Sequence, residues 1–159
     1  MSDTEHAAIA APSGPRLRLG GRLGIDPDAI ARAEAALAGL SSNFEAWMAD
    51  EITKLDAARA RIDSEGLTSE AAEGLYMRAH DLKGLGATYQ YPLVTRLAAS
   101  MCRLTHDPTR RASMPMALVD AHIHAIRRAV AEKVRTDEDP WGAATAADLE
   151  ARASAVPGG

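Results

Sequence analysis

Apolar residues recur every three or four positions along most of this chain, which is the spacing of one face of an α-helix. No segment alternates apolar and polar residues in the manner of a half-buried strand. The first strong stripe follows Ser42 and ends at Gly66. It consists of Phe44, Trp47, Met48, Ile52, Leu55 and Ile62. This pattern predicts a long amphipathic helix with one buried face.

Three further stripes are bounded by residues that start or stop helices. Thr68 can cap a second helix, which we expect to run to about Tyr89. Pro92 suits the first turn of a third helix, which we expect to close near His106. The fourth stripe again has spacings of three and four, and it consists of Met116, Val119, Ile123, Ile126, Val130 and Val134.

The N-terminal region has a weaker pattern. Residues 1–24 contain several Pro and Gly residues and no apolar periodicity, so we expect a flexible tail there. Asp26 before Pro27 is typical of a helix start, and Gly39 predicts the end of this short helix. The next helix would then start afresh at Ser42, which stands three residues before a Glu in the spacing of a capping box.

The C-terminal region is rich in Ala and ends in Pro-Gly-Gly. We therefore expect residues 137–159 to form a C-terminal tail with at most a short helix from Ala143 to Arg152. The four stripes all lie within residues 25–136. Four amphipathic helices with short links predict an all-α domain, an antiparallel four-helix bundle with a short accessory N-terminal helix.

Composition and charge narrow the class of protein. The 159 residues, 47% of them apolar, suffice for one domain with a hydrophobic core. A formal net charge of -4 without a basic run argues against nucleic acid or an anionic membrane as a partner. We see no secretory signal, and no apolar stretch approaches the roughly 20 residues of a membrane span. We therefore expect a cytoplasmic protein without membrane contact.

One histidine stands apart from the apolar stripes of the second helix. On a helical wheel of 3.6 residues per turn, Lys83 and Gly84 fall within about 60° of His80. Leu75 and Leu82 fall on the opposite side, where the core is expected. His80 is therefore expected on the outward face of its helix.

Gly84 and Gly86 stand inside the same helix, where each costs about 1 kcal/mol relative to Ala. Gly86 falls on the core side, so close helix packing explains its presence. Gly84 falls on the outward side, one turn from His80, where packing explains nothing. A missing side chain at this position would let the surface of another molecule approach the imidazole.

The run from Ala79 to Ala87, Ala-His-Asp-Leu-Lys-Gly-Leu-Gly-Ala, followed by Leu93 and Leu97, resembles the signature of histidine-containing phosphotransfer (HPt) domains. The similarity in specific residues covers about Tyr76 to Leu104. The segment from Tyr89 to Pro92 departs from it, because the family more often has small residues and a Gly before the next helix.

The resemblance implies a phosphocarrier and not an enzyme with its own kinase activity. His80 would accept a phosphoryl group from the receiver domain of a hybrid histidine kinase and pass it to the receiver domain of a response regulator. A neutral imidazole is a competent nucleophile near pH 7. Lys83 would stabilise the phosphoryl oxygens, and Gly84 would leave room for the receiver.

The same resemblance sets expectations about partners and cofactors. The Mg²⁺ that the transfer needs would come with the receiver domain, so we expect no cofactor or metal on this chain. The chain is expected to be a monomer, because it supplies enough helices for a bundle by itself. The receiver would dock on further residues around the histidine, which are Glu73, Tyr76, Met77 and Ala87.

Other interpretations remain open at this point. The chain could be a dimeric phosphoacceptor module derived from a histidine kinase, or a helical protein-binding adaptor in which His80 is incidental. A metal-dependent enzyme is a distant third, because His122 and His124 stand two residues apart and would point about 200° apart on a helix. We interpret both histidines, and those at positions 6 and 106, as ordinary ones, and Cys102 as a small buried hydrophobic residue.

Overall fold

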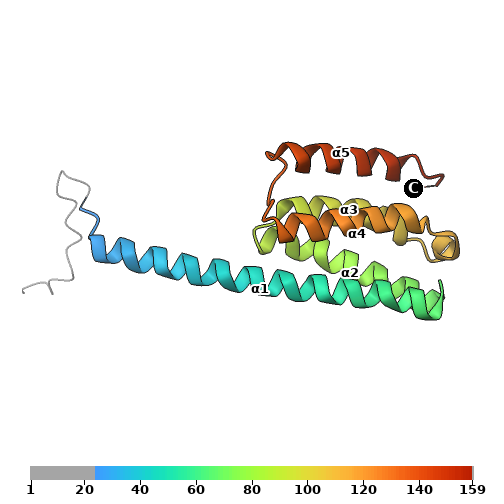
Figure 1. Cartoon of the computed structure of the whole chain (residues 1–159), viewed down its shortest axis with the longest axis horizontal. Helices are drawn as coiled ribbons and strands as arrows, with labels where there is room; N and C mark the ends of the chain where they lie inside the picture. Colours follow the sequence, from blue (N-terminus) through green and yellow to red (C-terminus); the bar gives the residue numbers. More distant parts are fainter. Residues whose placement is uncertain (1–23, 159) are drawn as a thin grey trace, which may run out of the picture. The chain divides into compact units, whose positions relative to one another are not determined.

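The computed structural model describes residues 24–158, and these residues form helices and connecting turns without any strand. The predicted all-helical class is thus confirmed for this part of the chain, while the tail expected over residues 1–24 lies almost wholly outside it. The elements, labelled in Figure 1, are α1 (Pro27–Glu65), α2 (Ser69–Thr88), α3 (Pro92–Thr105), the 3-10 helix η1 (Pro108–Ser113), α4 (Met116–Ala131) and α5 (Pro140–Ser154).

The first helix corrects one prediction. The expected short accessory helix is not a separate element, because α1 runs without a break from Pro27 to Glu65. Its start is as predicted, since the Asp26 carboxylate accepts a hydrogen bond from the Asp28 amide at 3.0 Å. No capping box forms at Ser42, since this residue lies inside the helix and the carboxylate of Glu45 pairs instead with Arg135 at 3.2 Å.

Gly39 does not end α1, although an interior glycine costs about 1 kcal/mol relative to Ala. A Cβ built on Gly39 would meet nothing within 4 Å, so neither packing nor a turn requires the glycine. The strong helix formers around it, mostly Ala and Leu, outweigh this cost. The described residues fall into two units that divide after Leu37, and residues 24–40 are all exposed.

The hydrophobic core belongs to the second unit, which begins at Ala38. Helix α2 packs on α3, and α3 also packs on α4 and α5. Each helix buries one face, and the largest buried aliphatic side chains are Met48 and Leu55 on α1, Leu75 and Leu82 on α2, Leu93, Leu97 and Met101 on α3, and Ile123 and Ile126 on α4. Most residues of the predicted apolar stripes therefore form the interior, but Trp47, which was expected on the buried face of α1, is 46% exposed.

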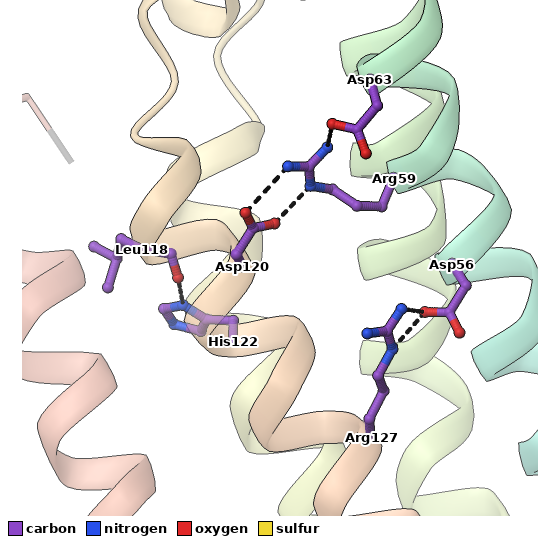
Figure 2. Close-up of polar contacts among 7 residues, drawn as sticks. All are labelled: Asp56, Arg59, Asp63, Leu118, Asp120, His122 and Arg127. Carbon is purple, nitrogen blue, oxygen red and sulfur yellow. Dashed lines mark hydrogen bonds and ion pairs between the residues drawn. The ribbon is translucent and has the colours of Figure 1, made fainter.

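Ion pairs join α1 to α4 at the edge of this core (Figure 2). The guanidinium of Arg59 donates from Nε to Asp120 at 2.5 Å and from Nη1 to Asp63 at 2.7 Å. One turn earlier on α1, Asp56 accepts from Nε of Arg127 at 2.6 Å. These residues are partly exposed, so the pairs contribute modestly to stability while they select which helices lie together.

The C-terminal residues contain a longer helix than the short one considered from Ala143 to Arg152. Asp139 caps α5 by accepting a hydrogen bond from the Gly142 amide at 3.0 Å, and Pro140 occupies its first turn. Helix α5 packs on α3 and α4 and buries the residues Gly142, Ala146, Leu149 and Ala153. Small side chains on this face allow close approach, and a Cβ on Gly142 would lie 3.0 Å from Leu93 Cδ2.

The turn between α2 and α3 is built from bulky residues. Gln90 has a φ of 65°, a conformation that favours glycine, and it follows the end of α2. The amide of Tyr91 donates to the Gly86 carbonyl at 2.7 Å and that of Gln90 to the Ala87 carbonyl at 3.1 Å, which is a Schellman motif. Tyr91 is buried, and the ring of Tyr89 stacks on Phe44 at 5.8 Å. The bulky residues of this turn therefore stabilise the end of α2.

Candidate functional site

His80 lies on the exposed face of α2, as its position on the helical wheel predicts. Lys83, Gly84 and Ala87 are also exposed, whereas Leu82 is fully buried. Within the described residues, no side chain or backbone group forms a hydrogen bond with the His80 ring. An exposed imidazole without protein partners keeps its lone pair available for a reaction.

Gly84 and Gly86 of α2 play different parts. A Cβ on Gly86 would lie 2.5 Å from Thr95 Oγ1 and 2.7 Å from the Thr95 amide nitrogen, so Gly86 is required for α2 to pack on α3. A Cβ on Gly84 would meet nothing within 4 Å. The prediction that only Gly86 is explained by packing is therefore confirmed, and the open surface above Gly84 begins one turn from His80.

An open depression of about 290 Å³ lies beside His80, between α2 and α3. Helix α2 contributes Tyr76, His80 and Lys83 to its lining. Helix α3 and its C-cap contribute Cys102, Arg103 and His106. No carboxylate lines this depression, so the histidine is flanked by basic and neutral groups.

A stack of side chains supports one wall of the depression. The ring of Tyr76 lies 5.9 Å from that of His80, and the guanidinium of Arg111 lies 5.3 Å from the centre of the Tyr76 ring. Arg111 is buried and donates from Nε to the Thr105 carbonyl at 3.0 Å. This arrangement holds the tyrosine ring against the imidazole through an arginine that the end of α3 keeps in place.

The residues expected to dock a receiver do not all lie together. Glu73, Met77 and Ala87 are exposed on the same helix as His80. Met77, however, lines a separate apolar groove toward α1, whereas Tyr76 lines the depression beside His80. The structure therefore groups Tyr76 with His80 and Lys83 and puts Met77 on the other flank.

His122 differs from His80 in its surroundings. His122 is fully buried, and its Nδ1 must donate to the Leu118 carbonyl at 2.8 Å, because a carbonyl only accepts (Figure 2). Its Nε2 therefore accepts from the Ser100 hydroxyl at 2.9 Å. Burial lowers the pKa of His122. His124 is exposed, and position 6 lies outside the described residues.

Sequence reasoning missed the α3 side of the depression. Arg103 and His106 belong to another helix and its C-cap, so the sequence alone could not place them next to His80. Burial raises the pKa of the Cys102 thiol, while the charge of Lys83 opposes this shift. Lys83 and Cys102 line the same depression, so α3 and the His80 face of α2 are neighbours.

Compared with known protein families, with curated proteins and with solved structures, the chain has no match. Residues 24–158 contain no group of three or more His, Cys, Asp or Glu side chains that could hold a metal ion. In the same part of the chain, no helix combines the length and apolar character needed to cross a membrane.

Proposed function

We propose that this chain is a cytoplasmic phosphocarrier of the HPt type, which relays phosphoryl groups between receiver domains of a two-component pathway. The observation that carries the proposal is the exposed face of α2, where His80, Lys83 and the side-chain-free surface of Gly84 lie together. His80 is the acceptor in this proposal, and Lys83, one turn along α2, lines the same depression. The chain has no kinase activity of its own.

The proposed transfer needs little from the protein beyond position and charge. A nitrogen of the neutral His80 ring forms a bond to phosphorus, and the aspartate of the donor receiver leaves as a carboxylate with the electron pair of the broken P–O bond. The reverse sequence delivers the group to a second receiver. Lys83 offsets the charge on the phosphoryl oxygens, and the receiver brings the Mg²⁺.

The fold part of this proposal is an antiparallel four-helix bundle made of residues 38–65 of α1 with α2, α3 and α4. Contacts between α2 and α3 and between α3 and α4 support it, as do the ion pairs of α1 with α4. The pair of Arg61 with Glu70 adds a link between α1 and the start of α2, at 3.5 Å. Helix α5 then covers α3 and α4 from outside.

The direct test is phosphoryl transfer from phosphorylated receiver domains to the purified full chain. We expect acid-labile label on the wild type and on the His122→Gln and His124→Gln variants, and none on His80→Gln. Label on His80→Gln would exclude His80 as the acceptor. An adaptor in which His80 is incidental would bind receivers and remain unlabelled in every variant.

A second experiment separates a carrier from a kinase-derived module. ATP and Mg²⁺ alone should leave the chain unlabelled, and label should appear only when a phosphorylated receiver is added. The mass of the chain in solution should be that of a monomer, whereas a kinase-derived phosphoacceptor module needs two chains. Autophosphorylation or an obligate dimer would favour that alternative.

Gly84 allows a test of close approach by the receiver. Glu at this position should leave the free protein folded, because the space above the glycine is open, and should slow transfer severely through bulk and negative charge. Gly39→Glu is a matched control, since a Cβ at Gly39 also meets nothing within 4 Å. Transfer by Gly84→Glu at the rate of Gly39→Glu would show that the receiver does not pass over this surface.

A further inference from the structure

The depression beside His80 is lined by cationic side chains from two different helices, α2 and α3. It is lined by Lys83 on α2, by Arg103 on α3, and by His106 at the C-cap of α3. Nδ1 of His106 donates to the carbonyls of Cys102 and Arg103 at 3.2 and 3.1 Å. Its Nε2 has no partner within the described residues.

The cations around this depression are unpaired. Lys83, Arg103 and Arg111 form no ion pair with any carboxylate of residues 24–158. By contrast, Arg59, Arg96 and Arg127, which lie elsewhere in the second unit, all pair with aspartate or glutamate. Unpaired like charges at a concave surface raise the local concentration of anions.

Arg111 adds a further positive charge close to the depression, although it does not line it. Its side chain is buried, and the hydrogen-bond partners that it has are the backbone carbonyls of Thr105 and His106. Carbonyl dipoles stabilise a buried guanidinium but leave its net charge in place. That charge stands against the Tyr76 ring, on the wall that the depression shares with His80.

From this geometry we infer that the depression is an oxyanion site, in which Arg103 and Lys83 hold the phosphoryl group from two helices once it is on His80. The inference rests on the proposed function and extends it to Arg103. The depression of about 290 Å³ is open to solvent, so a phosphoryl group on His80 has room in it. Arg103 thereby stabilises the phosphorylated state more than the free one.

Two measurements test the site, and the first does not depend on phosphotransfer. Inorganic phosphate titrated into the unphosphorylated chain at pH 7 should shift the ring resonances of His80 and His106 and leave that of His122 unchanged. The Arg103→Gln variant should weaken this binding about tenfold or more, the effect of one hydrogen bond to a charged group. Arg103→Lys should restore part of it, and Arg128→Gln, the matched control on α4, should behave as the wild type.

The second measurement is the equilibrium of phosphoryl transfer between a phosphorylated receiver and the chain. Arg103→Gln should shift this equilibrium toward the receiver by about tenfold, and Arg128→Gln should not. Unmoved ring resonances of His80 and His106 in the wild type, or equal behaviour of Arg103→Gln and Arg128→Gln in both measurements, would overturn the inference. Phosphate binding without any transfer to His80 would leave the oxyanion site standing and remove the proposed phosphorelay function.

Discussion

Two histidines of this protein, on two different helices, occupy opposite environments. His80 on α2 is exposed and forms no hydrogen bond within the described residues. His122 on α4 is fully buried, and both of its ring nitrogens have partners, the Leu118 carbonyl and the Ser100 hydroxyl. A buried imidazole with partners on both nitrogens has no free lone pair, so His122 links α3 and α4, whereas the ring of His80 has no partner within the described residues.

The ion pairs of the protein also differ between two regions, one between α1 and α4 and the other between α2 and α3. On the α1–α4 side, Arg59 and Arg127 are neutralised by Asp120 and Asp56 (Figure 2). On the α2–α3 side, Lys83 and Arg103 have no carboxylate partner among residues 24–158. Paired cations help α1 to associate with α4, whereas unpaired ones remain available to a ligand from outside.

The largest expected effect is on stability and concerns the buried histidine. His122→Ala should lower the free energy of unfolding by about 2 to 4 kcal/mol, because it opens a cavity and leaves the Ser100 hydroxyl without its partner. His80→Ala should change it by no more than about 0.5 kcal/mol, since the side chain is exposed. Urea denaturation of both variants measures the difference. Equal losses would show that the two environments are not distinct.

A smaller effect on stability is expected when Gly86 or Gly84 of α2 is replaced. Gly86→Ala should destabilise the protein by about 1 to 3 kcal/mol, because the added methyl group would collide with Thr95, whose Oγ1 also accepts from the Ala87 amide at 2.8 Å. Gly84→Ala should stabilise it by up to about 1 kcal/mol. Thermal melting of the two variants should therefore shift in opposite directions, and a shift in the same direction would contradict the packing argument.

The pH dependence of stability should follow His122. Its pKa is lowered in the folded protein, whereas the unfolded chain titrates at the ordinary value of 6.5, so the unfolded state binds more protons between the two values. Stability from this group is fully present above pH 6.5 and is lost as the pH falls toward the folded pKa. Unfolding free energies at pH 7.5 and 5.0 measure this loss, which His122→Gln should reduce and His80→Gln should preserve.

The smallest effect on stability is expected when a single arginine loses its charge. Arg127→Gln removes a half-exposed pair with Asp56 and should cost at most about 1 kcal/mol, less in high salt. Arg103→Gln removes an arginine without an ion pair in the described chain and should leave the unfolding free energy unchanged. Denaturation at low and high salt distinguishes the two variants. A salt-dependent loss in Arg103→Gln would mean that this arginine has a structural partner.

Helix boundaries with a strong local signal could be predicted from the sequence. Thr68 caps α2 by accepting a hydrogen bond from the Ala71 amide at 3.1 Å, and Pro92 begins α3. The outward position of His80 followed from the helical period alone. The short helix ending at Gly39 was predicted wrongly, because an isolated glycine is a weak signal when strong helix formers surround it.

The sequence by itself determined which residues share a face of α2, because side-chain direction in a helix depends only on the period of 3.6 residues. Only the tertiary structure decided which helices became neighbours. It put Arg103 and His106 beside His80, paired Glu45 with Arg135, and packed α5 on α3 and α4. These contacts join residues far apart in the chain, and they depend on the summed packing of whole helix faces, which no local pattern encodes.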